Sequence, residues 1–537
     1  MTGLLTCADV IAQTLSASGV RYVFGHPGGE VLDFMLALES RNIEFLLAGH
    51  ESAAAFMAGA VGRITGFPGV CLATLGPGAC NLVIGVGSAF LDRDPLLAFS
   101  ARTTSSRCGM SSKQHLRLND LFAPISKWSL ALNGTRTAET LRSAISVAQT
   151  APCGPVYLTL PSDVAVSPDR TDGVVPALPV QPAANDGDFE AIRQALNRAR
   201  RPIGIIGISL NARSARNAVR SFFAETGIPY VTSPQAKGLA DESGDTFVGT
   251  VGAGAGDTPI LDFLSQSDCL LGIGFDPVES SQDWYFEHSL YSLSHCATGF
   301  GQYRPTAECV GDVGVFLDRL RMGYSCASSW TPSEIPKVRQ RVHSVICPSS
   351  EKDIGGLAPF HLFRALRQAL PDETIVTCDV GAHKMLLSQA WQAPEPGTFL
   401  VSNGLSAMGY GVPTAITAAL LYPNRPVVGI IGDGGFGMMV QELETAKRIG
   451  VNPLFVVLCD RSLAVIKIAQ NDRGMPHRGV DFAPVDWVKV GQGFGARVSA
   501  PSRLVDVDKE VAYWLEQREL TVLAVPVDER LYVGLTY

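Results

Sequence analysis

Short apolar runs alternate with amphipathic stretches along most of the chain. The apolar runs are too short for helices and show little in-out alternation, which is typical of strands buried on both faces of a parallel sheet. Glycine or proline residues interrupt many of the connections. The predicted strands include residues 22–25, 44–48, 69–74, 96–100, 204–207, 269–274 and 373–378. Strands that alternate with helices in this way predict an α/β fold built from doubly wound parallel sheets.

The amino-terminal stretch predicts an amphipathic helix that ends at Gly19. It has neither the basic region nor the long apolar region of an export signal. Elsewhere the apolar stretches stay shorter than the roughly 18 residues of a membrane-spanning helix, so we expect no membrane association.

Two segments interrupt the pattern and are predicted linkers. Residues 161–187 are rich in proline and weakly periodic, and residues 325–336 form a second break. A chain of 537 residues is also too long for a single hydrophobic core. We therefore predict three α/β domains, at residues 1–165, 188–325 and 355–537.

Composition narrows the class of partners. Hydrophobic residues make up 46% and charged residues 18%, as in a folded protein with large cores. The net charge of -8 comes without a basic stripe, so nucleic acid is excluded as an expected partner. The 12 cysteines form no CxxC pair, which favours reduced thiols and a cytoplasmic location over disulfides or a zinc site.

Residues 426–460 contain the most informative motif. An apolar run leads into Gly432-Asp433-Gly434-Gly435, a helical pattern follows, and a second apolar run ends at Cys459-Asp460. Glycines allow close approach to an anion, and carboxylates at the carboxyl ends of neighbouring strands suit a hard cation. The motif predicts a site for a metal-bound diphosphate, although an ordinary strand-to-helix turn can carry the same glycines.

Glu51 is a second candidate, because it opens a strongly apolar helix, AAAFMAGAVGR, directly after a predicted strand. A carboxyl group in such surroundings can share a proton with a ring nitrogen of a ligand. The structural alternative is that Glu51 caps the helix and interacts with its dipole.

The Gly432-Asp433-Gly434 turn, followed after residues 435–458 by Cys459-Asp460, resembles the signature of the thiamine-diphosphate-dependent enzymes. Within them the chain resembles the acetolactate synthases, and the catabolic members most. Further elements in family order are FGHPGGEV near residue 24, GPGACN at 76–81, Gln114 ahead of Lys127, GIGFDPVE at 272–279, VGAH at 380–383 and SNGLSAMG at 402–409. Two residues depart from the usual motif: Cys459-Asp460 replaces an Asn-Asn pair, and Gly435 replaces a serine.

The resemblance implies a role for each matching residue. Glu51 would hydrogen-bond the aminopyrimidine ring of thiamine diphosphate and promote loss of the thiazolium C2 proton, with Gln114 and His115 facing the substrate. Magnesium would be held by Asp433, Asp460 and the main-chain carbonyl of Ser462. The cofactor would be bound by Gly28, Gly78, Asn81, Gly381, His383, Ser406, Met408, Gly434 and Gly435. For His115 and Met408, a structural role and simple core packing remain the alternatives.

The middle region bears on cofactor and substrate. Of the glycine cluster that is usual in the central domain of the resembling family, Gly204 and Gly207 remain, which argues against the FAD that some family members hold. The arginine that biosynthetic members offer to the second 2-oxo acid is lacking. Arg461 and Lys467 add positive charge near the expected pocket and either grip an anionic substrate or are solvated surface charges.

The family implies a carboligase that decarboxylates a 2-oxo acid and transfers the acyl group to a second carbonyl. A decarboxylase without ligation and a non-catalytic cofactor-binding subunit are the alternatives. The family also implies a homodimer or homotetramer with sites at the subunit interface.

Overall fold

The computed structural model describes residues 5–107, 113–175, 177, 187–210, 212–279, 289–297, 303–325, 328–348, 356–532 and 534–535. It divides into two compact units. The first comprises residues 1–181 together with 416–421 and 441–450, and the second comprises the rest of the chain.

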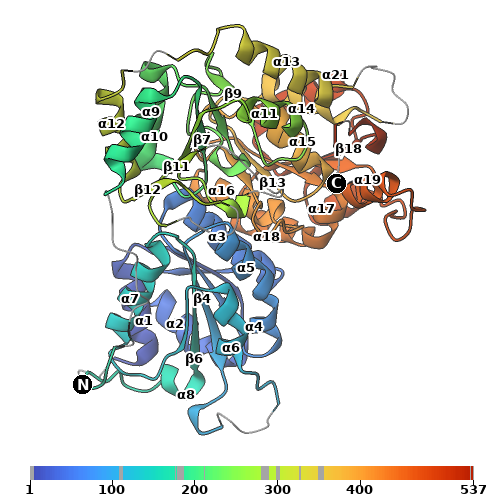
Figure 1. Cartoon of the computed structure of the whole chain (residues 1–537). Helices are drawn as coiled ribbons and strands as arrows, with labels where there is room; N and C mark the ends of the chain where they lie inside the picture. Colours follow the sequence, from blue (N-terminus) through green and yellow to red (C-terminus); the bar gives the residue numbers. More distant parts are fainter. Residues whose placement is uncertain are drawn as a thin grey trace. The chain divides into compact units, whose positions relative to one another are not determined.

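The first unit contains a six-stranded, all-parallel sheet of order β2-β1-β3-β4-β6-β5. Helices lie on both faces of this sheet, shown in blue and cyan in Figure 1, and a buried aliphatic and aromatic core fills the space between the layers. The helix predicted to end at Gly19 is confirmed as α1, which Gly19 follows with a φ of 88°. The strands of the first unit are β1 (Tyr22–His26), β2 (Glu44–Leu47), β3 (Gly69–Ala73), β4 (Leu96–Arg102), β5 (Trp128–Ala131) and β6 (Pro155–Pro161). The helices around this sheet are α1 (Cys7–Ala17), α2 (Leu32–Glu39), α3 (Glu51–Thr65), α4 (Pro77–Asn81), α5 (Val83–Leu91), α6 (Leu118–Phe122), α7 (Thr137–Gln149) and α8 (Ser162–Ala165).

The second unit contains two further six-stranded parallel sheets, of order β12-β11-β10-β7-β8-β9 and β14-β13-β15-β16-β18-β17. One continuous core cluster contains residues of both sheets, so the two sheets fall within one compact unit. The first of these sheets has strands β7 (Pro202–Ile206), β8 (Tyr230–Thr232), β9 (Phe247–Thr250), β10 (Cys269–Ile273), β11 (Leu290–Ser294) and β12 (Ala307–Val310), with α9 (Phe189–Arg198), α10 (Ala212–Thr226), α11 (Asp257–Leu264), α12 (Val313–Met322) and α13 (Glu334–Ile346).

The last sheet carries the glycine-rich turn. Its strands are β13 (Ile375–Cys378), β14 (Phe399–Val401), β15 (Val427–Gly432), β16 (Leu454–Cys459), β17 (Arg497–Ser499) and β18 (Thr521–Pro526). The helices along this part of the chain are α14 (Pro359–Ala369), α15 (Ala382–Ala390), α16 (Gly411–Leu421), α17 (Asp433–Met439), α18 (Glu442–Ile449), α19 (Ala464–Asp472), α20 (Trp487–Gly493) and α21 (Leu504–Gln517), and the last turn is η6 (Glu529–Leu531). The predicted α/β class with doubly wound parallel sheets is confirmed.

The second predicted linker, at residues 325–336, has neither helix nor strand among its described residues before Glu334, and its role as a domain linker stays a prediction. Helix α13 begins at Glu334 and includes Pro336, which sits in the first turn, where proline is tolerated. Trp330 packs its ring against Phe263, with centroids 4.4 Å apart, and its indole N–H donates to the Pro202 carbonyl. A large aromatic side chain thus anchors a segment that composition alone marks as a break. The first predicted linker, at 161–187, lies partly outside the described residues, and its start belongs to β6 and α8.

Candidate functional site

Glu51 is the first residue of α3 in the first unit. The helix is capped by His50, whose Nδ1 accepts from the Ser52 main-chain N–H at 3.1 Å. The interpretation of Glu51 as the capping side chain is therefore wrong, although its place in the first turn still suits a negative charge. Glu51 is only 8% exposed, and its carboxylate has another partner.

That partner is Asn81, whose side-chain amide donates to Glu51 Oε2 at 2.9 Å. Asn81 ends the short helix α4, which follows the turn after β3. A Cβ atom added to Gly78 would lie 3.1 Å from Glu51 Oε1 and 2.8 Å from the Thr74 methyl group, so glycine at 78 leaves room for the carboxylate. The structure thus brings together Glu51, Gly78 and Asn81.

Two other predicted residues reach the same corner of the first unit. A Cβ atom on Gly28 would lie 2.4 Å from Thr74 Oγ1, and that hydroxyl donates to Glu30 at 2.8 Å. Gln114 has a φ of 63° and packs next to Gly76, where an added Cβ would lie 3.0 Å from the Gln114 Cβ. Its neighbour in the chain, His115, is half-buried, and its role stays a prediction.

The predicted metal ligands lie at the carboxyl end of the third sheet, in the second unit. Asp433 starts α17 directly after β15, and Asp460 follows β16. The two strands are parallel neighbours, with Gly432 paired with Leu458, so both carboxylates emerge at one sheet edge. Asp433 accepts from the Arg461 main-chain N–H and Asp460 from that of Ser462, each at 2.9 Å.

These two carboxylates are electrostatically coupled. Burial raises the pKa of Asp433. Burial and, next, the charge of Asp433 raise the pKa of Asp460 to about 7. Because two buried like charges destabilise each other, a divalent cation between them would relieve the repulsion. Each carboxylate has a second oxygen besides the one that accepts a main-chain N–H, so the pair fits a magnesium ion.

Among the described residues, no three His, Cys, Asp or Glu side chains come together as a metal-binding group. A metal at Asp433 and Asp460 would therefore take its remaining ligands from other oxygen atoms, such as a main-chain carbonyl, a phosphate or water. The resemblance assigns the main-chain carbonyl to Ser462, which is buried at 7% exposure two residues after Asp460.

The 402–409 segment has an unusual backbone held by internal hydrogen bonds. Ser406 has a φ of 53°, and its hydroxyl donates to the Asn403 carbonyl at 2.8 Å. The buried Lys384 donates to the Asn403 side chain at 3.1 Å and to the Ser402 carbonyl and Ser406 hydroxyl at 3.3 Å. Sequence analysis missed this lysine, and the available signal was a charged residue inside the apolar pattern of α15, directly after His383.

Asp379 joins several predicted cofactor-binding residues. Its Oδ2 accepts from the Gly409 main-chain N–H at 2.9 Å, and its Oδ1 lies 3.1 Å from His383 Nε2. The His383 ring also packs against Gly381. A Cβ atom on Gly435 would lie 1.9 Å from Asp379 Oδ2, so no side chain fits there. Gly435, which stands where the resembling family usually has serine, thus leaves room for the Asp379 carboxylate.

Met408 and Phe482 lie against the glycine turn. A Cβ on Gly434 would be 3.1 Å from the Phe482 ring and 3.3 Å from the Met408 methyl group. Met408 is only half-buried, which differs from simple core packing. Phe482 was missed because it follows Gly434 by 48 positions in a stretch with no clear periodicity.

The sheet of the middle region offers little to an anionic cofactor at the end of β7. The buried Glu279 carboxylate accepts from the Ile208 main-chain N–H at 2.7 Å and bonds the Ser233 hydroxyl. An internal carboxylate therefore takes a main-chain donor that a bound diphosphate would need. This geometry argues in the same direction as the thinned glycines at Gly204 and Gly207.

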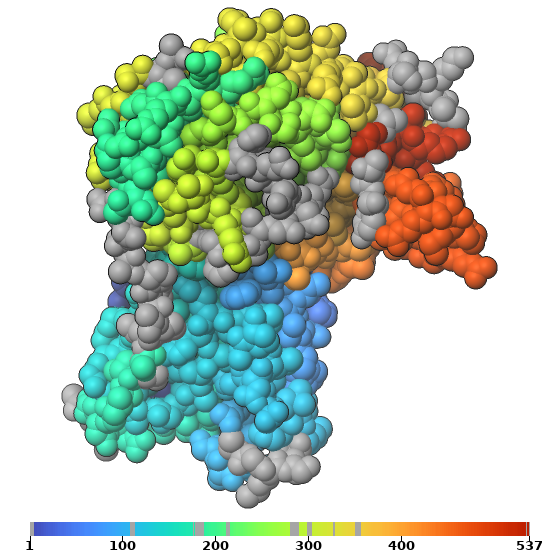
Figure 2. Space-filling view, in the orientation of Figure 1, coloured from blue at the N-terminus to red at the C-terminus, as the bar shows by residue number. Residues whose placement is uncertain are grey.

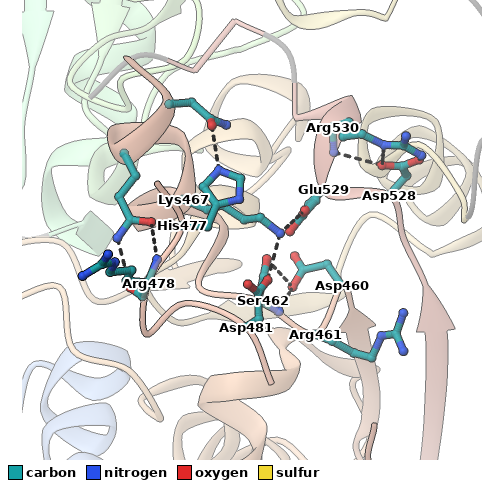
Figure 3. Close-up of polar contacts among 12 residues, drawn as sticks. Asp460, Arg461, Ser462, Lys467, His477, Arg478, Asp481, Asp528, Glu529 and Arg530 are labelled. Carbon is teal, nitrogen blue, oxygen red and sulfur yellow. Dashed lines mark hydrogen bonds and ion pairs between the residues drawn. The ribbon is translucent and has the colours of Figure 1, made fainter. Parts of the chain in front are cut away.

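Arg461 and Lys467 differ in their surroundings. Arg461 is exposed, whereas the Lys467 side chain is only 17% exposed and pairs with Asp481 and Glu529 (Figure 3). The alternative of a solvated surface charge is therefore wrong for Lys467.

None of the described helices is long and apolar enough to cross a bilayer.

Comparison with known proteins yields matches along the whole chain. The models of the thiamine pyrophosphate enzyme family match in order: the N-terminal TPP binding domain at residues 5–121, the central domain at 189–320 and the C-terminal TPP binding domain at 379–525. The chain is 30% identical to an acetolactate synthase of Bacillus subtilis, over 97% of this chain and 93% of that protein. It is 29% identical to the catabolic acetolactate synthase of Raoultella terrigena, over 97% and 95%. The chain therefore belongs to the acetolactate-synthase-like family of thiamine-pyrophosphate-dependent enzymes.

Proposed function

We propose that the enzyme is a magnesium-dependent carboligase that decarboxylates a 2-oxo acid and joins the remaining acyl group to a second carbonyl compound. The observation that carries this proposal is that both chemical parts are intact in one chain. Glu51 is buried and held by Asn81, and Asp433 and Asp460 form a coupled carboxylate pair. A non-catalytic subunit would have no reason to retain both.

In the first unit, Glu51 is the proposed proton-transfer residue. Thiamine diphosphate supplies a nucleophilic carbon that adds to the substrate carbonyl and accepts the electrons released with carbon dioxide. Glu51 Oε1 faces Gly78, while Oε2 is held by Asn81, so one carboxylate oxygen can meet a ring nitrogen of the cofactor. Gln114 and His115 are proposed to face the substrate.

In the second unit, Asp433, Asp460 and the Ser462 carbonyl are the proposed magnesium ligands. The main-chain groups of Gly434 and Gly435, which carry no side chain, and the His383 ring next to Gly381 would hold the diphosphate. Ser406 and Met408 would support the cofactor rings, with the Ser406 backbone fixed by its own hydroxyl and by Lys384.

Ligation is favoured over simple decarboxylation because the relatives that match over nearly the whole chain are named acetolactate synthases. The fate of the acyl group alone separates the two reactions, so decarboxylation to an aldehyde is the second candidate. FAD has no part in the proposed chemistry.

We also propose an assembly of two or four chains with the active site at the subunit interface, as the family resemblance implies. Leu32 and Leu36 lie one turn apart on α2 and are 57% and 67% exposed, which suits burial in an interface. Residues 1–165, 188–325 and 355–537 remain the proposed domains. No disulfide joins the cysteines in the part of the chain that the structure describes, in keeping with the proposed cytoplasmic location.

The test is to incubate the purified enzyme with thiamine diphosphate, Mg²⁺ and pyruvate, and to follow carbon dioxide and products by mass spectrometry. Acetolactate supports the proposal, and acetaldehyde alone would assign the enzyme as a decarboxylase. If pyruvate is inert, larger 2-oxo acids are tried, and inactivity with all of them would contradict catalysis. Glu51→Gln is the control, and its turnover should fall by roughly 10³-fold.

A further inference from the structure

The segment 461–482 folds back on itself beside the glycine turn. The Leu463 main-chain N–H donates to the Val480 carbonyl, and that of Phe482 donates to the Arg461 carbonyl, each at 2.7 Å. These two bonds close a loop that contains α19 and the residues after it. The ends of the segment thus lie side by side, one at the proposed metal ligands and the other at Phe482.

Little burial holds this segment in place. Residues 471–479 are exposed, and so are residues 481–486. Figure 2 shows this part of the second unit in orange, projecting from its surface. Because exposed loops of this kind open at low free-energy cost, specific polar contacts must decide how well the segment is ordered.

Lys467 supplies such contacts. Its ammonium lies 2.9 Å from Asp481 Oδ1 and also pairs with Glu529 Oε1 (Figure 3). Lys467 belongs to α19, Asp481 to the returning end of the loop and Glu529 to η6, three parts that are separate in sequence. Exposed ion pairs are individually weak. The pair with Glu529 is shielded, since Lys467 is 17% and Glu529 24% exposed, whereas Asp481 is 59% exposed. Glu529 therefore holds the ammonium in place, and Asp481 joins it from the loop.

The η6 turn gives Lys467 a firm anchor. Asp528 caps the turn by accepting from the Arg530 main-chain N–H at 3.0 Å. Leu531, the last residue of the turn, and the following Tyr532 are both buried. The turn that holds Glu529 is therefore fixed by its own cap and by packing on both sides of its end.

The other partner, Asp481, precedes Phe482, whose ring covers Gly434 next to Met408. Asp481 also forms an isolated antiparallel bridge with Ser462. A contact that fixes Asp481 consequently fixes the approach of Phe482 to the turn and the backbone at Ser462.

We propose that Lys467 is a positioning residue that latches the 461–482 segment to η6, so that Phe482 and the Ser462 main chain are already placed at the glycine turn before the cofactor binds. The consequence for thiamine diphosphate and magnesium rests on the function proposed above, whereas the latch itself does not. Lys467 acts through Asp481 and Glu529, and it is committed to these carboxylates rather than to the substrate.

The test compares Lys467→Met, which keeps the length of the side chain, with Lys467→Arg, which keeps the charge. Lys489→Met is the matched control, because Lys489 of α20 forms an exposed ion pair at 2.8 Å with Asp486, the residue that precedes this helix. Amide hydrogen exchange of the full chain without cofactor is measured first. We expect exchange within residues 463–482 to be about tenfold faster in Lys467→Met, and unchanged in Lys467→Arg and in the control.

Calorimetric titration with thiamine diphosphate and Mg²⁺ follows, and Lys467→Met should bind about tenfold more weakly. Unchanged exchange in 463–482, or faster exchange spread over the whole chain, would overturn the latch. Faster local exchange with unchanged cofactor affinity would overturn preorganisation of the site. If the unaltered enzyme itself fails to bind the cofactor, the function proposed above fails, while the exchange result still decides the latch.

Discussion

The carboxylates of the two units are held in opposite ways. Glu51 accepts from one neutral side-chain donor, the Asn81 amide, whereas Asp433 and Asp460 accept main-chain N–H groups and the charge of Asp433 raises the pKa of Asp460. A carboxylate with one oxygen held by an amide is suited to passing a proton. Two neighbouring buried carboxylates are suited to a cation, because a bound metal ion removes the electrostatic repulsion between them. The carboxylate group is thus suited to different chemistry in the two units, because its hydrogen-bond donors and neighbouring charges differ.

The largest expected effect on turnover comes from replacing Glu51 in the first unit. Glu51→Gln keeps the shape of the side chain and removes its capacity to exchange a proton, so kcat should fall by roughly 10³-fold. Cofactor affinity, measured by calorimetry, should change by less than about threefold. A comparable loss of affinity and turnover would mean that Glu51 binds the cofactor rather than activating it.

For the pair of Asp433 and Asp460, we expect thermal stability and cofactor binding to change in opposite directions. Asp460→Asn removes one of two repelling buried charges, so the melting temperature without cofactor should rise by roughly 2 °C. Affinity for thiamine diphosphate with Mg²⁺ should fall by roughly 100-fold, since the loss of a metal ligand should weaken binding at least as much as the loss of a residue that orients one. Differential scanning calorimetry and titration check the two parts, and a lower melting temperature without cofactor would contradict the coupling.

The next prediction concerns Gly435, in the glycine-rich turn of the second unit. Gly435→Ser places a Cβ 1.9 Å from the Asp379 carboxylate, which is itself fixed by Gly409 and His383. We expect about tenfold weaker cofactor binding together with a lower melting temperature, because overpacking strains the surrounding backbone. Gly397→Ser is the control for a serine in open space, as no atom lies within 4 Å of its added Cβ, although its φ of 73° adds local strain.

The smallest effect should follow from removing the partner of Glu51. Asn81→Ala leaves the carboxylate in place without its amide donor, and kcat should fall by about fivefold, since a single hydrogen bond to a charged group is lost. Asn81→Gln, whose longer side chain retains the amide, should restore part of the activity. Equal activity of the Asn81→Ala variant and the unaltered enzyme would show that the 2.9 Å contact does not position Glu51.

Sequence predicted the sheets well because buried parallel strands need continuous apolar runs. Residues 22–25, 269–274 and 373–378 all fall on strands, with shifts of one or two residues at the ends. It predicted the strand, turn and helix around Asp433 for the same reason, but not that the helical pattern divides into α17 and α18. Local patterns report burial and periodicity, and they carry less information about where a helix breaks.

What only the tertiary structure decided are the partners of the charged groups. Nothing near Glu51 in sequence shows that His50 caps α3 or that Asn81, 30 positions on, holds the carboxylate. Lys467 reads as a surface charge until Asp481 and Glu529 are placed around it by a loop and a turn 14 and 62 positions away. By itself the sequence determined the fold class, the family motifs and which side chains can do chemistry, because backbone propensity and residue type are local properties. The tertiary structure decided which groups share a proton, a charge or a position, because those depend on distances across the fold.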